Sequence, residues 1–249
     1  MFRLLSATYT DSSEWLASPR GRLFVQYERQ LLCSLLPSLT GYRCIQVGSW
    51  GIDRAALDRA GTLCQWRVGL GADPDADIVF DGRRLPLASG SVDAVVITHG
   101  LEQVADPHAL LRDCARVLSE RGQLVALVFN PLSLWALRQG LPSRRSTRFQ
   151  PCSAPPSAGR LSDWMRLLEF CPEQLWRYGL GFPVFGRGFR VGREHRWMQS
   201  IAWCSQAYLM TARRQVSPRT PVAGSLRKRR RLPAAALARS SHRGVTCRR

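Results

Sequence analysis

The sequence of 249 residues has no long apolar run, and Lys228 is its only lysine. Its longest apolar stretches, such as residues 123–129, are far shorter than the roughly 20 residues that a membrane-spanning helix needs. Charged side chains interrupt the first residues, so the N-terminus lacks the pattern of a secretory signal. We therefore expect no membrane span and a cytoplasmic protein.

The eight cysteines are scattered, and no two of them stand in the CxxC spacing of zinc or redox sites. The four histidines form no ligand pattern with them. Most of the cysteines lie within apolar patterns, where a free thiol behaves as a small hydrophobic side chain. The sequence thus predicts neither a metal site nor a disulfide framework, which fits a reducing compartment.

Acidic residues are absent from the C-terminal part of the chain. Twelve basic residues lie between Arg213 and Arg249, which is two thirds of the formal net charge of +18. No hydrophobic periodicity survives there, so we predict a basic, disordered tail. The run RKRRR at residues 227–231 can bind polyanions by charge. It has no interleaved aromatic side chains to stack on single-stranded bases, so nucleic-acid binding is the less favoured interpretation.

Segments with strand and helix patterns alternate through the middle of the chain. The expected strands are residues 42–47, 62–68, 78–80, 92–98 and 123–129, and the expected helices between them are residues 52–60 and 106–118. An earlier helix is expected within residues 14–40, and a helix at 161–170 and strands at 173–178 and 199–212 follow. Such alternation is typical of an α/β fold, with a doubly wound parallel sheet and helices on both faces.

The first expected strand runs into a glycine-containing loop, CIQVGSWG at residues 44–51. A strand that leads through glycines into a helix offers backbone N–H groups to a ligand, and Gly48 permits close approach. The loop is neither a GxGxxG motif nor a P-loop, so by itself it does not distinguish a ligand site from an ordinary turn.

A longer pattern occupies residues 81–131, DGRRLPLASGSVDAVVITHGLEQVADPHALLRDCARVLSERGQLVALVFNP. With the glycine loop, it resembles the class I S-adenosylmethionine-dependent methyltransferases, in the small-molecule branch similar to ubiquinone and menaquinone biosynthesis enzymes. The N-terminal helix and residues 129–135, FNPLSLW, resemble a little-characterised bacterial subgroup of that superfamily. The resemblance covers residues 40–131 and implies a Rossmann-like, mostly parallel seven-stranded sheet whose last strand is reversed.

The resemblance also implies an enzyme that binds S-adenosylmethionine and transfers its methyl group to an unidentified, small-molecule acceptor. It divides the chain into an N-terminal helical cap (residues 1–40), a methyltransferase-like domain (residues 41–212) and the basic tail (residues 213–249). Catalysis in this family rests on aligning the acceptor with the methyl carbon. The family takes its acceptor residues from segments that correspond here to residues 14–40 and 130–160.

The family's cofactor loop maps onto the glycine loop residue by residue. Gly48 matches its first glycine, and Ser49 and Gly51 are the neighbouring cofactor-binding candidates. The loop is degenerate, because Gln46 replaces the acidic residue that ends the family's first strand and Trp50 replaces its second glycine.

Acidic residues that hold the nucleoside are expected after the next two strands. Asp81 matches the family's acid or amide that accepts from the adenine amino group, with Gly82 beside it. The carboxylate that binds the ribose hydroxyls is missing from the end of the second strand, and Asp73 and Asp75 are the candidates to replace it.

Thr98 and His99 lie at the end of the fourth strand, where the family's methionine moiety and acceptor meet. His99 is the candidate general base, which is needed only when the acceptor holds a proton that must leave first. The alternative is that His99 caps the strand or hydrogen-bonds a neighbour. Glu102 is a candidate contact for the ligand's amino group, or a capping residue.

Two other functions stay open. An RNA methyltransferase could use the basic tail for affinity, although Asn130-Pro131 follows the fifth strand and no N-methylating signature follows the fourth. A non-catalytic methyltransferase-like scaffold is favoured by Gln46, Trp50 and the missing ribose acid, and disfavoured by the intact pattern over residues 81–122. Nothing in the sequence indicates the oligomeric state.

Overall fold

A computed structural model describes residues 18–48, 54–70, 73, 75–82, 84–133, 153–180 and 205–215. The chain divides into two compact units, Met1–Val216 and Ser217–Arg249, and every described residue lies in the first. Of the predicted features, Ser49, Trp50, Gly51 and the basic run at 227–231 lie outside the described residues.

Seven strands form one sheet in the order β3-β2-β1-β4-β5-β7-β6. They are β1 Thr40–Val47, β2 Gly61–Leu70, β3 Ile78–Phe80, β4 Val92–Thr98, β5 Leu118–Phe129, β6 Phe170–Leu180 and β7 Ser205–Arg214. The pairs from β3 to β5 are parallel, and β7 is antiparallel to both of its neighbours. The predicted doubly wound, mostly parallel sheet with a reversed last strand is confirmed.

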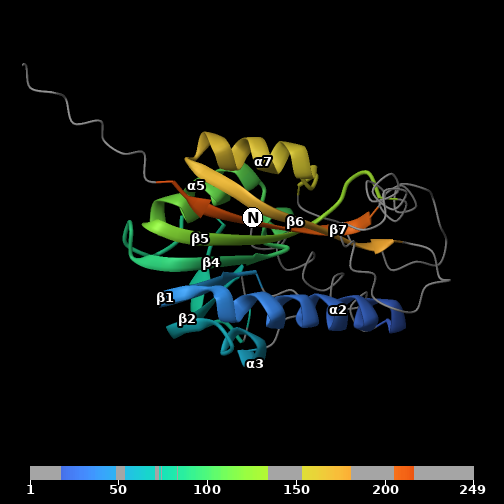
Figure 1. The fold of residues 1–249 in the computed structure, drawn as a ribbon, viewed down its shortest axis with the longest axis horizontal. Coiled ribbons are helices and arrows are strands. Elements are labelled where there is room, and N and C mark those ends of the chain that lie inside the picture. Colours follow the sequence, from blue (N-terminus) through green and yellow to red (C-terminus); the bar gives the residue numbers. More distant parts are fainter. Residues whose placement is uncertain are drawn as a thin grey trace, which may run out of the picture. The chain divides into compact units, whose positions relative to one another are not determined.

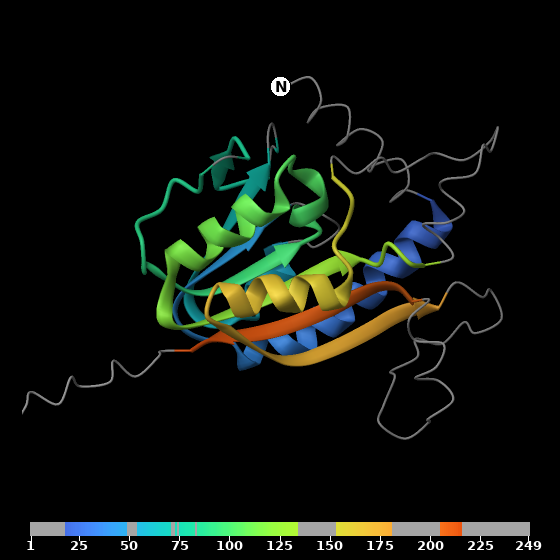
Figure 2. The ribbon, with the colours of Figure 1, turned by 90° about the horizontal axis from the view of Figure 1, so that it is seen from above.

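Three longer helices cover the two faces of the sheet (Figures 1 and 2). They are α2 Pro19–Leu35, α5 Pro107–Val117 and α7 Ala158–Leu167, and the short elements are η1 Leu36–Ser38, α3 Arg54–Leu57 and α4 Gly100–Gln103. Ser18 caps α2 by accepting from the Gly21 N–H at 3.1 Å, and Asp106 caps α5 by accepting from the Ala109 N–H at 2.9 Å. No helix among the described residues is long and apolar enough to cross a membrane.

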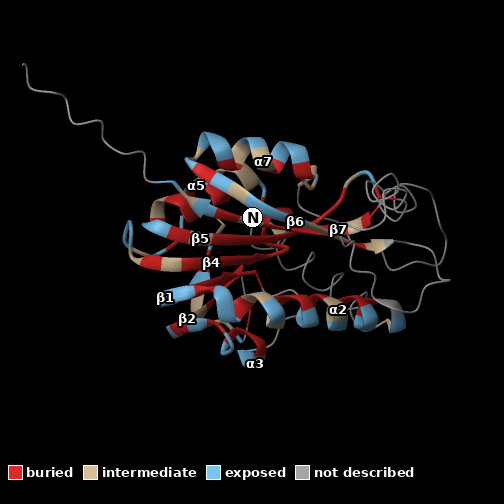
Figure 3. Cartoon of the chain, viewed as in Figure 1, coloured by how far each residue is buried: buried red, intermediate tan, exposed pale blue. Residues whose placement is uncertain are grey.

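The central strands are buried on both faces, as parallel strands between two helical layers must be (Figure 3). In β4, Val95 and Ile97 face the cluster that packs beneath α5 and α7, whereas Ala94 and Val96 face the cluster beneath α2 and α3. Because β4 is buried on both faces, its sequence is a nearly continuous run of apolar, mostly β-branched residues, which is the pattern that predicted the strand.

The boundaries of the outer elements differ from the sequence prediction. The last strand includes Arg213 and Arg214, which the sequence assigned to the tail. The reason is local pairing: Arg213 lies opposite Gln123 of β5, and the Arg214 guanidinium donates to the carbonyls of Ala115 and Leu118 at 3.1 and 2.8 Å. Arg214 at the strand end thus satisfies two carbonyls, which the distribution of charge along the sequence does not predict.

Candidate functional site

The candidate site lies where the central strands β1 and β4 end. Val47 of β1 pairs with Val68 of β2 and with Ile97 of β4, so the carboxyl ends of these strands lie at the same edge. The chain continues from β1 toward β2 and β3 on one side, while β4 and β5 lie on the other. Ligands of open α/β sheets bind at such a switch point, outside the carboxyl ends of the strands.

Gly48 forms a turn that no other residue could make without strain. Its φ of +97° lies in the region that favours glycine. A Cβ atom at this position would lie 2.5 Å from the carbonyl oxygen of Thr98. The backbone after β1 therefore passes directly against the end of β4, and the structure brings the predicted residues Gly48 and Thr98 together.

Gln46 holds this turn through its side-chain amide. Its buried Nε2 donates to the Gly48 carbonyl at 3.1 Å and to Thr98 Oγ1 at 3.3 Å, and Thr98 Oγ1 donates to the same carbonyl at 2.9 Å. These three hydrogen bonds form a closed triangle. A carboxylate at position 46 could only accept hydrogen bonds, so the amide fixes the turn by donating where the family's acid could not.

Asp73, rather than Asp75, lies against the end of β2. It is buried, and a Cβ atom added at Gly69 would lie 2.7 Å from the Asp73 Cβ. Its Oδ1 accepts from the Asp75 N–H at 3.1 Å. The Asp75 side chain is 77% exposed and lies 4.0 Å from an Arg67 guanidinium nitrogen. The position beside the strand end therefore favours Asp73 as the ribose candidate.

Asp81 and Gly82 directly follow β3, as predicted. Asp81 is exposed, and Gly82 has a φ of +84°. Since β3 is parallel to β2, both residues lie at the same edge of the sheet as Asp73 and Gly48.

His99 is fully buried between two carboxylates. Its Nε2 lies 2.8 Å from Glu28 Oε1 of α2, and its Nδ1 lies 3.3 Å from Glu102 Oε1 of α4. Its backbone has a φ of +52°, and its N–H donates to the Leu127 carbonyl at 3.0 Å. The structure thus joins helix α2 to the end of β4 through this one side chain.

The surroundings of His99 make it a cation at neutral pH. Burial alone would lower the pKa of the imidazole, but the charges and hydrogen bonds of Glu28 and Glu102 outweigh it and raise that pKa to about 9. With both nitrogens protonated, the ring has no lone pair with which to accept a proton. The general-base role of His99 stays a prediction, and this arrangement does not favour it.

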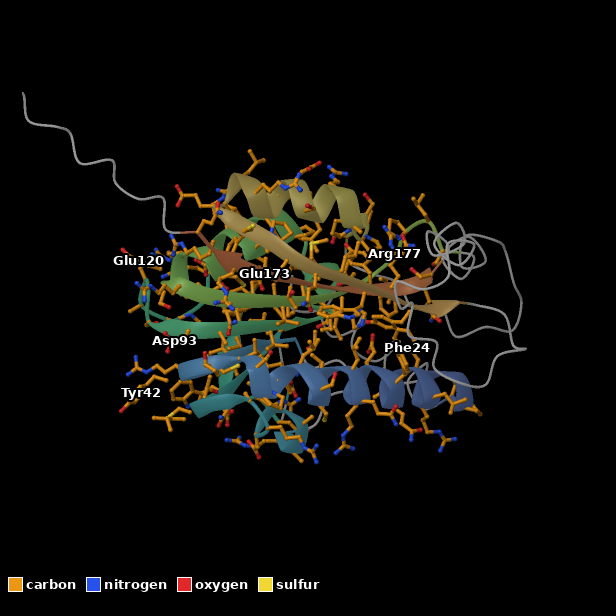
Figure 4. All side chains as sticks on the ribbon, viewed as in Figure 1. Phe24, Tyr42, Asp93, Glu120, Glu173 and Arg177 are labelled. Carbon is orange, nitrogen blue, oxygen red and sulfur yellow. The ribbon has the colours of Figure 1, made fainter. Side chains whose placement is uncertain are left out.

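Aromatic rings surround the imidazolium. The ring centroids of His99 and Phe129 are 4.1 Å apart, and Phe24 stacks on Phe129 at 5.7 Å. Phe24 points from α2 toward the sheet (Figure 4). The faces of such rings carry partial negative charge, which stabilises a neighbouring cation.

Each carboxylate of this cluster uses one oxygen and leaves the other without a hydrogen bond. Glu28 Oε1 accepts from the Tyr178 hydroxyl at 2.5 Å as well as from His99, and Glu102 Oε1 also accepts from the Phe129 N–H at 2.6 Å. Burial and the neighbouring charge of Glu28 raise the pKa of Tyr178 well above its ordinary value, so the phenol stays a donor. Glu28 Oε2 and Glu102 Oε2 are buried with no partner among the described residues. An unpaired buried acceptor costs about 1–3 kcal/mol or more, so both oxygens call for a donor.

Glu28 and Tyr178 belong to this cluster but were not predicted from the sequence. A signal for Glu28 exists, because it lies four residues after Phe24 and three before Leu31 and is therefore on the apolar face of its helix. Nothing local marks Tyr178, which is 150 residues from Glu28 along the chain.

The described residues contain no group of three or more His, Cys, Asp or Glu side chains that could hold a metal ion. The cysteines in that part of the chain are free, and burial raises the pKa of the Cys44 thiol to about 12. That thiol is a packing group.

Comparisons with known proteins fit this geometry. Residues 47–126 match the family described as "Methyltransferase domain". The uncharacterised protein YafS of Escherichia coli (strain K12) is 30% identical over 158 residues, which are 63% of this chain and 64% of that protein. Demethylmenaquinone methyltransferase of Corynebacterium glutamicum (strain R) is 34% identical over 86 residues, which are 32% of this chain and 37% of that enzyme. The chain thus spans less than two thirds of the length of these curated relatives.

A solved structure shares the fold. An S-adenosylmethionine-dependent methyltransferase from Thermotoga maritima superposes with a TM-score of 0.56 at 13% identity, over 86% of this chain and all of that one. The strand order, the glycine turn after β1 and the match of residues 47–126 all point to a methyltransferase fold. Residues 47–126 are thus similar in sequence to a methyltransferase domain, and the chain shares its fold with an S-adenosylmethionine-dependent methyltransferase.

Proposed function

We propose that this protein is an enzyme that transfers a methyl group from S-adenosylmethionine to a small-molecule acceptor. The observation that carries the proposal is the closed hydrogen-bond triangle of Gln46, Gly48 and Thr98. It holds the glycine turn at the switch point although the loop departs from the family's pattern. A chain that had lost its ligand would have no need to keep a turn that only glycine makes without strain.

The residues at the strand ends fit the parts of the cofactor. Gly48 offers its backbone at the turn to the methionine moiety, Asp73 can accept from the ribose hydroxyls, and Asp81 can accept from the adenine amino group. Ser49 and Gly51 would complete the loop. When bound, the cofactor supplies an electrophilic methyl group on a sulfonium, which needs no further activation.

The protein's own part in catalysis is alignment. Helix α2 lies over the end of β4 and is fixed there by the contact of Glu28 with His99. Because Glu28, His99 and Glu102 are all fully buried, the cluster excludes water from the place where the acceptor would meet the methyl group. A group that reaches these fully buried side chains must be small, which favours a small acceptor over a polymer.

A transfer assay with fractionated cell extract tests this function. The full chain is incubated with methyl-labelled S-adenosylmethionine and separate small-molecule, RNA and protein fractions. We expect label in the small-molecule fraction. Label in RNA that disappears at high salt would instead support the basic tail as an RNA-binding element, and no label in any fraction would support the scaffold.

A further inference from the structure

The unpaired oxygens of Glu28 and Glu102 point to a ligand group that supplies hydrogen-bond donors. Both carboxylates are fully buried and anchored through Oε1, so neither can turn to solvent. Within the described part of the chain, no side chain or backbone N–H reaches either Oε2. A binding group with N–H or O–H donors would complete this cluster.

The charges of the cluster specify the group further. Two acidic side chains lie against one basic side chain, and all three are fully buried. A hydroxyl would supply a donor but no charge, whereas a protonated amine supplies both. A metal ion fits poorly, because both His99 nitrogens already contact carboxylates. The described residues also contain no group of His, Cys, Asp or Glu side chains that could hold a metal.

Glu28 is the carboxylate that the acceptor would meet. It lies on α2, outside residues 47–126 that match the methyltransferase family, and so does its anchor Tyr178. Members of a family defined by its cofactor share the cofactor-binding residues, whereas their acceptors differ. A ligand contact held by residues outside the shared region therefore belongs to the acceptor.

Resting on the proposed function, we propose that Glu28 Oε2 binds the protonated amine of the acceptor and that the enzyme methylates this nitrogen. Glu28 takes one proton from the ammonium, which frees the nitrogen lone pair. The lone pair forms the new nitrogen–carbon bond while the carbon–sulfur bond of the sulfonium breaks, and its electrons stay on the sulfur as a thioether. The product is the methylated ammonium, and Glu28 gives up its proton to the water that enters the site as the product leaves.

The first test uses the charge of the labelled product. Wild type, Glu28→Gln and the exposed control Glu120→Gln are compared with the labelled small-molecule fraction. We expect a product that cation exchange retains at neutral pH and releases at high pH. We also expect kcat/KM to fall about 100-fold in Glu28→Gln alone, with the affinity for S-adenosylhomocysteine changed less than threefold in all three proteins.

Several outcomes of this test would overturn the inference. A neutral or anionic product would assign the acceptor to another class, and unchanged transfer by Glu28→Gln would mean that Oε2 binds only water. A matched loss of S-adenosylhomocysteine affinity in Glu28→Gln would place the carboxylate in the cofactor site. Wild-type protein that binds S-adenosylhomocysteine but labels nothing would overturn the proposed activity as well.

The second test does not depend on turnover. The complex with S-adenosylhomocysteine is melted in 100 mM ethylammonium chloride and in sodium chloride with ethanol at the same ionic strength. If ethylammonium binds with a Kd of about 10 mM, the Tm should rise by roughly 2–4 °C in wild type and Glu120→Gln. The rise should be absent in Glu28→Gln, and an equal Tm in both salts for wild type would contradict an amine subsite.

Discussion

Replacing Gly48 by alanine is expected to weaken S-adenosylhomocysteine binding at least tenfold and to destabilise the fold. The new Cβ would lie 2.5 Å from the Thr98 carbonyl oxygen, a backbone atom that cannot move alone. The φ of +97° adds strain of about 1–3 kcal/mol for a residue with a side chain. The turn must shift, and the triangle that Gln46 closes must open. Calorimetric titration and denaturant unfolding measure the two effects.

Gly90 offers a matched control for this substitution. Its φ is +66°, but a Cβ there would meet no atom within 4 Å. Gly90→Ala should therefore share the backbone strain and leave the ligand affinity unchanged. If Gly48→Ala binds as tightly as Gly90→Ala, the turn after β1 does not form the cofactor site.

Replacing His99 by alanine should lower the free energy of unfolding by about 3–5 kcal/mol at pH 7, because it leaves two buried carboxylates without their cation. His108→Ala, on the half-buried surface of α5, is the control and should cost less than about 1 kcal/mol. Urea unfolding monitored by tryptophan fluorescence measures both. A loss below about 1 kcal/mol for His99→Ala would show that the buried cluster is not an ion network.

His99 also makes the free energy of unfolding of the wild-type protein depend on pH, with a predictable direction. The pKa of His99 is raised to about 9 in the folded state, above the value near 6.5 expected in the unfolded chain. Its stabilisation, about 3 kcal/mol, is fully present below pH 6.5 and is lost as the pH rises through 9. His99→Ala should not show this loss between pH 6.5 and 9, and an identical slope in both proteins would contradict the assignment of the charge to His99.

The fold was predictable because its signals are local. The β-branched run of β4 and the Asp106-Pro107 start of α5 are read within a few residues. The seven-stranded sheet with a reversed last strand was implied by the resemblance to a family, since alternation of strands and helices does not specify which strands are neighbours. The last strand extends to Arg214, beyond the predicted end at residue 212, because Arg214 binds the carbonyls of Ala115 and Leu118 and charge alone does not show this.

The candidate site was only partly predictable. The resemblance places Gly48, Thr98 and Asp81 at the ends of strands, and the structure confirms these positions. The donation from the Gln46 amide to the turn is not visible in the sequence, where Gln46 only departs from the family's acid. The partners of His99 could not be foreseen in full, because Glu28 is 71 residues away and reaches it only through the docking of α2 on the sheet. A contact between residues so far apart in the chain produces no recognisable spacing pattern in the sequence.

The most direct test of the central claim is a calorimetric titration of S-adenosylhomocysteine into the full chain, with Asp81→Ala and Glu120→Gln alongside. The proposed cofactor site predicts saturable binding at one site with a micromolar Kd in wild type and in Glu120→Gln. It predicts affinity at least tenfold weaker in Asp81→Ala, which loses an acceptor for the adenine amino group. A folded wild-type protein that gives no binding heat and no rise in Tm with the ligand would contradict the claim and leave a methyltransferase-like scaffold.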